Sequence, residues 1–391
     1  SILPLIFIPI LTSELNPSEY GILVYFTSII SFCIPLIILN APTTYTFSFY
    51  KDKHLKNLLF QLFFISILGC LILSLIFFLT FSNLVEFNLF EKHIFIVPLF
   101  VLTLFFPDIF LVHAQLEKKP IVYATFQIFQ TLINFLLSIY FLFISDLGWI
   151  SRIYGWGLAN LFFSCISFYI LFKNHKFNLF TLNLNGIKKN FLFGFNLLPH
   201  ALSSLAIMVS GRICLGSFGS SEELGYFGLG FQIASVLSFL TASINNAIAP
   251  EIYETFKSKN MHKINTLLKL SLYYFFILII FGVLISFIFP LIFNFLNPSY
   301  KPALKFSLIL VWGFIFLSFI SHSAHGFIFY GKTRLQSKIS TFIIIPSTFF
   351  LVVFTKLYGA LGTSLVFVLT LLFYCIINCY FSLKIIRKNI I

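Results

Sequence analysis

The chain has 391 residues, of which 59% are hydrophobic and only 9% are charged, and it carries a formal net charge of +13. A soluble domain has roughly 25% charged residues, so this composition excludes a soluble globular protein and places most of the apolar surface in lipid. The basic residues lie in short loops between apolar segments, which argues against nucleic acid as a partner.

Apolar segments of about 20 residues, the length that crosses a bilayer, recur along the whole chain. We predict an all-α integral membrane protein with about twelve transmembrane helices. We expect the first helix to be truncated, because the chain starts at Ser1 inside an apolar run. The predicted spans are residues up to 11, 21–41, 58–80, 94–114, 121–145, 153–172, 196–216, 226–249, 268–290, 305–330, 339–355 and 359–383.

The loops between these spans differ in their content of Lys and Arg. Six alternate loops hold 19 of the 25 Lys and Arg residues, whereas the opposite loops hold five, and Arg212 is the remaining one. Basic residues are enriched in cytoplasmic loops, so this bias predicts that both chain ends are cytoplasmic. The sequence has no phosphate-binding Gly-Lys loop and no metal-ligand spacing, so we predict no cofactor, and any transport is passive or driven by an ion gradient.

The basic loop at 173–195 divides the predicted spans into six and six. We therefore predict an N-terminal six-helix lobe at 1–172, a cytoplasmic amphipathic linker at 173–195 and a C-terminal six-helix lobe at 196–391. An offset of 204 residues aligns the two halves with 8 identities in 43 positions, among them Glu19 with Glu223 and Gly21 with Gly225. Six spans per half is an even number, so the lobes run in the same sense, related by a pseudo-two-fold axis along the membrane normal.

Arg212 is a cation inside a predicted span, about four residues, or roughly 6 Å, from its periplasmic end. A charged side chain at the bilayer centre costs about 2.5–3.5 kcal/mol on insertion scales. The side chain therefore either reaches the periplasmic interface by snorkelling or provides a cationic contact in a central cavity, and the sequence leaves both interpretations open.

Other ionisable side chains gather toward the cytoplasmic half of the predicted spans. Asp108 is the only carboxylate well inside a span, and it follows Pro107, which we expect to kink the helix. Histidines at a similar level are His200, His322, His325 and, near the end of the fourth span, His113. These groups either line a cytoplasm-open cavity or are scattered interfacial side chains.

The eighth predicted span has a stripe of small and polar residues on one helical face. Gln232, Ser235, Phe239, Ser243 and Asn246 follow one another at spacings of three and four. Such a face either lines a water-filled path or packs against a neighbouring helix.

Residues 194–256 contain three short motifs: Leu198-Pro199-His200, Glu223-Leu224-Gly225-Tyr226-Phe227 and Ala247-Ile248-Ala249-Pro250. In this order they resemble the polysaccharide flippase family, and further agreement extends the resemblance over nearly the whole chain, at 12–21, 290–303 and 329–333. The chain departs from the family pattern at Gly211, where members often have Asp, and at Ser48, where Arg is common.

The resemblance implies a non-enzymatic transporter in a bacterial inner membrane. It implies that undecaprenyl-pyrophosphate-linked oligosaccharide repeat units of O-antigen or capsule cross from the cytoplasmic to the periplasmic leaflet by alternating access. It places substrate contacts at Arg212 and His200, with Gln232 and Asn246 as further cavity residues. It implies coupling to H⁺ or Na⁺, for which the candidates are Asp108, His322 and His325, and a glycan polymerase with its chain-length machinery as partners.

Two other functions are open. A multidrug or cation antiporter of the same fold would be expected to carry carboxylates within its lobes, whereas this chain has Asp108 alone. A membrane-embedded glycan polymerase or acyltransferase would be expected to have a large external loop or a buried His–carboxylate pair, and neither is evident in the sequence.

Overall fold

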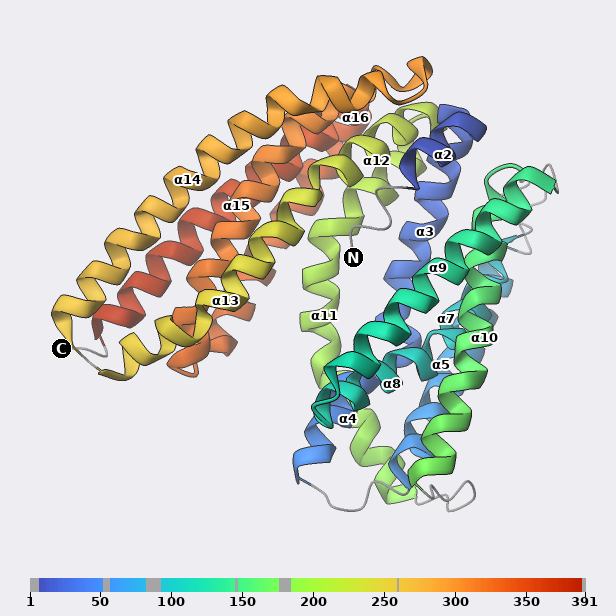
Figure 1. Ribbon diagram of the computed structural model, residues 1–391, viewed down its shortest axis with the longest axis horizontal. Helices are drawn as coiled ribbons and strands as arrows, with labels where there is room; N and C mark the ends of the chain where they lie inside the picture. Colours follow the sequence, from blue (N-terminus) through green and yellow to red (C-terminus); the bar gives the residue numbers. More distant parts are fainter. Residues whose placement is uncertain are drawn as a thin grey trace. The chain divides into compact units, whose positions relative to one another are not determined.

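The computed structural model describes residues 7–51, 57–81, 93–144, 147–175, 184–258 and 260–388, and the elements in these ranges are all helical (Figure 1). The helices up to residue 175 are α2 (Ile8–Glu14), α3 (Pro17–Ile38), α4 (Ala41–Lys51), α5 (Leu58–Phe81), α7 (Val97–Thr103), α8 (Phe105–Leu116), α9 (Pro120–Ile144) and α10 (Ile150–His175). Those that follow are α11 (Leu184–Phe218), α12 (Ser221–Ala234), α13 (Val236–Ser258), α14 (Met261–Asn294), the short 3₁₀ helix η2 (Pro298–Tyr300), α15 (Ala303–Phe329) and α16 (Thr333–Lys388).

Nine helices in the described part of the chain are long and apolar enough to cross a membrane. A tenth is added if the two parts of α11, bent by 59° between Ser203 and Leu205, count as one span. The chain is therefore a multi-pass, all-helical membrane protein, and its described residues hold nine or ten candidate spans, where the sequence predicted twelve for the whole chain.

Part of this difference comes from α16, which is a helical hairpin. Its backbone leaves helical geometry at Gly359, with φ 56° and ψ −136°. The hydroxyl groups of Thr355 and Thr363 are 2.9 Å apart, although eight residues of continuous helix separate two positions by about 12 Å. The chain therefore reverses at Gly359, and the helical stretches 333–358 and 360–388 are each long enough to span a bilayer. They coincide with the predicted eleventh and twelfth spans.

The membrane-facing character of the helices is clearest on α14. Its large exposed apolar side chains recur at alternating spacings of four and three, which places them on one helical face. They are Tyr273 (63% exposed), Ile277 (60%), Ile280 (59%), Leu284 (54%), Phe287 (74%) and Leu291 (59%). A stripe of this kind is stable only against lipid or another apolar surface.

The chain divides into two compact units, Ser1–Ile8 with Ile22–Leu205 and Pro9–Gly21 with Ala206–Ile391. In the first unit, α10 packs against α7, α8 and α9, and α4 packs against α8. In the second unit, α15 packs against α12, α13, α14 and α16 (Figure 1). The lobe and linker boundaries expected from the sequence stay a prediction, although residues 184–195 of the expected linker are helical and form the start of α11.

The 204-residue repeat marks the starts of α3 and α12, which carry matching N-terminal caps. The side chain of Asn16 accepts a hydrogen bond from the backbone N–H of Glu19 at 2.9 Å, and Ser220 accepts one from the N–H of Glu223 at 3.1 Å. The Glu19 carboxylate also accepts from the Asn16 N–H at 3.2 Å, which completes a capping box. The repeat therefore preserves the N-cap itself, whereas the carboxylate bond of the capping box is made by Glu19.

A reciprocal backbone contact follows one turn later, within the second unit. Gly21 lies against the carbonyl oxygen of Ser221, and Gly225 lies against the carbonyl oxygen of Pro17, so closely that a Cβ at either glycine would overlap the oxygen. Pro17 and Ser221 are themselves 204 residues apart. A contact in which equivalent positions exchange partners is the pattern that a local two-fold axis produces.

Candidate substrate and ion sites

Arg212 lies on α11 with its side chain held against protein. Its guanidinium lies over the ring of Phe231 at 4.8 Å from the centroid, and its Nη2 donates to the carbonyl of Met208 at 2.9 Å. Its Nε is buried and has no hydrogen-bond partner in the described residues. The side chain runs back toward Met208, away from the end of the helix at Phe218, which favours a contact inside the protein over snorkelling to the periplasmic interface.

Gln232 follows Phe231 on α12, and its Oε1 accepts a hydrogen bond from the hydroxyl of Tyr20 at 2.7 Å. We call Tyr20, Arg212, Phe231 and Gln232 the Arg212 cluster. Tyr20 was not selected from the sequence, because nothing in its local pattern shows that α3 crosses α12.

Tyr300 supports the Arg212 cluster from the loop before α15. Its ring meets the edge of the Tyr20 ring, with centroids 5.8 Å apart, and its hydroxyl donates to the carbonyl of Leu15 at 2.8 Å. Tyr300 is fully buried, and desolvation raises the pKa of its phenol well above the usual value, which keeps the donating proton in place. The loop is thereby tied to the start of the chain.

A polar pocket of about 280 Å³ lies in the first unit, between α4 and the start of α11. Its lining combines hydroxyl, amide and ammonium groups with aromatic rings, and we call it the first-unit polar pocket. Its lining residues are Thr44, Phe47, Ser48, Lys189, Asn190, Leu192, Phe193 and Asn196. Phe47 and Phe193 stack with centroids 4.7 Å apart, and the Asn190 amide donates to Gln61 at 2.8 Å.

Sequence reasoning missed this pocket because it assigned residues 173–195 to an interfacial linker. The structure places Lys189, Asn190 and Phe193 on one helix, where positions three and four apart share a face. The helical spacing of these residues was the available signal. Asn190 is 8% exposed and Ser48 is 6% exposed, so the polar groups at the base of the pocket are held by the fold.

The two histidines of α15 lie in one hydrogen-bonded network. His322 Nδ1 is 3.2 Å from Asn245 Oδ1, and its Nε2 is 2.9 Å from Ser271 Oγ. His325 Nδ1 is 3.0 Å from the hydroxyl of Tyr253. The two imidazole rings meet edge to face with centroids 6.2 Å apart, so the structure does bring these two predicted residues together.

Asn245, which was not selected from the sequence, faces the histidines. Asn245 is 4% exposed, and its amide also donates to the carbonyl of Ser318 on α15 at 3.3 Å. This second bond orients Oδ1 toward His322, so Nδ1 of that imidazole carries the proton. Asn246 was chosen for its spacing from Gln232, but the buried face of α13 is the one that carries Asn245.

Of the three other predicted site residues, Asp108 is not joined to these clusters, and the side chains of His200 and Asn246 cannot be placed. Asp108 lies half-buried on α8 in the first unit, whereas His322 and His325 belong to the second unit. The helix is interrupted three residues before Pro107, since α7 ends at Thr103 and α8 begins at Phe105, and the expected kink stays a prediction. His200 lies on α11 and Asn246 on α13, and the side chains of both are outside the described part of the structure.

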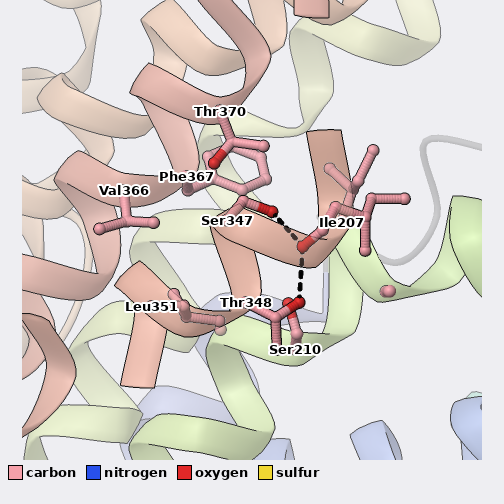
Figure 2. A pocket seen from close by; sticks show the side chains of 11 residues that line it. Ile207, Ser210, Ser347, Thr348, Leu351, Val366, Phe367 and Thr370 are labelled. Carbon is pink, nitrogen blue, oxygen red and sulfur yellow. Dashed lines mark hydrogen bonds between the residues drawn. The ribbon is translucent and has the colours of Figure 1, made fainter. Parts of the chain in front are cut away.

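A small pocket of about 20 Å³ lies between α11 and the two arms of α16 (Figure 2). This volume holds about one water molecule. The hydroxyls of Ser347 and Thr348 both donate to the carbonyl of Ile344 at 2.8 Å, and Ser210 and Thr370 also line the pocket. None of its eleven lining residues is acidic, so a cation there would meet only neutral oxygens.

Comparison with known sequences gives a family and a distant relative. A protein-family model described as "Polysaccharide biosynthesis protein" matches residues 1–256. An uncharacterized membrane protein of Haemophilus influenzae is 29% identical over 157 residues, which is 38% of this chain and 39% of that protein. The aligned part therefore spans about two fifths of the relative's length.

Two solved transporter structures share the fold of this chain. A multidrug resistance transporter of the MATE family, in the MOP superfamily, superposes with a TM-score of 0.77 at 14% identity, over 99% of this chain and 94% of that one. The lipid II flippase MurJ superposes with a TM-score of 0.78 at 16% identity, over 98% of this chain and 85% of that one. At these identities the likeness is one of fold.

Proposed function

Because this chain belongs to the polysaccharide biosynthesis protein family, we propose that it is a flippase for lipid-linked oligosaccharides. It carries undecaprenyl-pyrophosphate-linked repeat units of O-antigen or capsule from the cytoplasmic to the periplasmic leaflet of a bacterial inner membrane. The movement is ion-coupled alternating access, and no covalent bond is made or broken. The fold shared with a lipid II flippase supports this proposal.

The architecture proposed for this movement is two six-helix lobes about a pseudo-two-fold axis. The reciprocal contact of Gly21 and Gly225 supports such an axis, because equivalent positions exchange partners there. The bias of Lys and Arg toward alternate loops supports cytoplasmic chain ends. A glycan polymerase and its chain-length machinery would then receive the repeat units on the periplasmic side.

The observation that carries the proposal is the first-unit polar pocket. An oligosaccharide presents many hydroxyl groups, and a pyrophosphate presents negative charge. Asn190, Asn196, Thr44 and Ser48 offer amide and hydroxyl groups to sugar hydroxyls, and Lys189 offers a cation to phosphate. In the second unit, the Arg212 cluster offers a guanidinium whose Nε has no partner among the described residues, and an anionic oxygen would satisfy it.

Ion coupling is assigned to Asp108, His322 and His325. Asp108 is the strongest of these, because it is a half-buried carboxylate on a candidate span. Both ring nitrogens of His322 have hydrogen-bond partners, Asn245 and Ser271, whereas Nε2 of His325 has none among the described residues. We expect Asp108→Asn to reduce transport at least tenfold, and full transport by this variant would remove the role of Asp108.

Deletion of the gene in its own bacterium tests the function. We expect surface glycan to be lost and lipid-linked single repeat units to accumulate on the cytoplasmic leaflet, as measured by leaflet-selective labelling of membrane-bound glycan. Normal surface glycan in a strain without a second transporter would overturn the proposal. Single repeat units that reach the periplasm without being polymerised would also overturn it and would favour a polymerase.

The pocket is tested in the same strain by complementation. We expect Lys189→Ala and Asn190→Ala to lower surface glycan about tenfold at equal protein level, since each removes a polar contact worth about 1.5 kcal/mol. Lys188→Ala is the matched control, because it removes the neighbouring exposed cation, which does not line the pocket. An equal loss in the control would show a general charge effect and would exclude the pocket.

The fold is equally similar to that of a multidrug transporter, so an antiporter is the second candidate. That function predicts a different phenotype in the deletion strain, with normal surface glycan and increased sensitivity to cationic dyes. Measuring glycan and dye sensitivity in the same strain separates the two candidates.

A further inference from the structure

The second unit contains a cavity of about 290 Å³ whose wall includes His322 and His325, two of the residues proposed for ion coupling. It lies among α13, α14, α15 and the end of α16, and most of its lining is apolar, including Ile252, Leu268 and Phe319. We call it the C-terminal cavity. An apolar cavity with a few polar groups is the usual form of a small-molecule site.

The side chains of the C-terminal cavity that can carry a positive charge are His322, His325 and Arg387. Cys379 adds a thiol, and no Asp or Glu is among the sixteen lining residues. Arg387 lies at the end of α16, exposed, and forms no ion pair in the described ranges. The chemical complement of this lining is therefore an anion attached to an apolar body.

His325 has a ring nitrogen without a hydrogen-bond partner at the cavity wall. This atom, Nε2, is buried and lacks a partner among the residues described, and the side chain is only 9% exposed. Tyr253 has no other hydrogen bond in that part of the chain, and in the tautomer in which its hydroxyl donates to Nδ1, the ring proton lies on Nε2. A buried N–H without an acceptor costs about 1–3 kcal/mol, which an incoming acidic oxygen would recover.

The first unit shows how such an imidazole is satisfied by an acid. There, Tyr45 bonds Nδ1 of His113 at 2.9 Å, and Nε2 of the same ring lies 3.3 Å from the carboxylate of Glu117. Glu117 is four residues after His113, and the residue four after His325 is Phe329. The second copy of the pair therefore lacks the carboxylate that completes the first.

We propose that the C-terminal cavity binds a single-chain anionic amphiphile, whose acidic head lies at His325 and Arg387 and whose hydrocarbon chain lies along the apolar wall. Fatty acids and single-chain phosphate lipids share this chemistry. Pockets for drug-sized ligands measure roughly 300–1,000 Å³, so a cavity of about 290 Å³ suits one chain and its head rather than a two-chain lipid. The site shares His325 with the proposed ion coupling, so it is tested by ligand binding to the purified chain rather than by transport.

A metal ion does not explain the site. The described residues contain no group of three His, Cys, Asp or Glu side chains placed to hold a metal. His322 is already engaged on both ring nitrogens. The cavity also has far more apolar wall than a metal site needs.

The test uses the full chain in nanodiscs of neutral lipid, with a dansyl-labelled fatty acid as the fluorescent probe and empty nanodiscs as background. We expect saturable binding that is displaced by dodecanoate and by dodecyl phosphate. Dodecanoate methyl ester tests the need for charge, and inorganic phosphate tests the need for the chain, so both should compete at least tenfold more weakly. Equal competition by either compound would overturn the amphiphile assignment, as would an absence of saturable binding.

Variants locate the site. We expect Arg387→Gln and His325→Phe each to weaken probe binding about tenfold, because each removes one charged or hydrogen-bonding contact to the head. Lys388→Gln is the matched control, since it removes the adjacent cation that does not line the cavity, and it should bind as the unchanged chain does. Unaltered binding by both test variants, with intact elution on size exclusion, would overturn the assignment.

Discussion

The two units each contain a Tyr–His pair, and the pairs differ in what meets the far nitrogen of the imidazole. In the first unit, the rings of Tyr45 and His113 are 6.0 Å apart at 67°, and in the second, those of Tyr253 and His325 are 5.3 Å apart at 78°. The tyrosines are 208 residues apart and the histidines 212, close to the 204-residue offset of the helix starts. The pair therefore recurs at equivalent places in the two halves.

The surroundings of the two pairs are not equivalent. His113 lies in a closed network, because Glu117 meets its Nε2 and is itself bonded to Lys119 at 2.7 Å. His325 lies beside the C-terminal cavity, and Phe329 occupies the position that corresponds to Glu117. The chain itself therefore supplies the acid at His113, whereas at His325 the corresponding place faces the C-terminal cavity, where we propose that a ligand supplies it.

The largest effect is expected where the two halves are alike. Gly21→Ala and Gly225→Ala each place a methyl group against a carbonyl oxygen of the other helix, so α3 and α12 must separate. We expect each to destabilise the protein by about 3 kcal/mol, at the upper end of overpacking costs. Thermal unfolding of the purified protein in detergent measures this, and the exposed Ser18→Ala on the same helix serves as control.

Because the contact is reciprocal, the two glycine variants should be affected to the same extent. A large loss for one glycine with none for the other would contradict a local two-fold relation between α3 and α12.

A middle-sized effect should distinguish the two Tyr–His pairs. His113→Phe removes a hydrogen-bond partner of the fully buried Tyr45 hydroxyl and one of the contacts of the Glu117 carboxylate. We expect a loss of about 2–3 kcal/mol, compared with about 1 kcal/mol or less for His325→Phe, which also removes an unpaired buried N–H. Chemical unfolding in mixed micelles compares the two variants. Equal losses of stability would show that His325 is as fully hydrogen-bonded as His113.

The smallest effect is expected from Phe329→Glu, which gives the Tyr253–His325 pair a carboxylate like that of Glu117 in the first unit. Phe329→Glu supplies a carboxylate four residues after His325, but it removes the packing of Phe329 on Tyr253 and Phe256. These changes oppose each other, so we expect a net stability change within about 1 kcal/mol. A double-mutant cycle with His325→Phe should give a coupling energy of about 1 kcal/mol between the new carboxylate and the imidazole.

The same variant should weaken binding of the anionic probe about tenfold, because the new carboxylate competes with the ligand head. An absence of coupling in the cycle, with unchanged probe binding, would show that Nε2 of His325 is not accessible to an acid.

Composition and periodicity were sufficient to predict a multi-pass helical protein, because in lipid every span must satisfy its backbone hydrogen bonds internally. The last two spans were placed correctly, since Gly359 separates two apolar runs. The closeness of His322 and His325 was also predictable, because residues three apart on a helix share a face. The contacts of these histidines with Asn245, Tyr253 and Ser271 were not predictable, because those three residues lie on two other helices.

What the sequence alone determined is therefore local: the helices, their caps at Asn16 and Ser220, and the repeat that relates the two halves. The tertiary structure decided which side chains meet, including Tyr20 with Gln232, the first-unit polar pocket and the cavity beside His325. The physical reason is that hydrophobic periodicity identifies the face that leaves the lipid, whereas the partner of a buried polar atom depends on how separate helices cross.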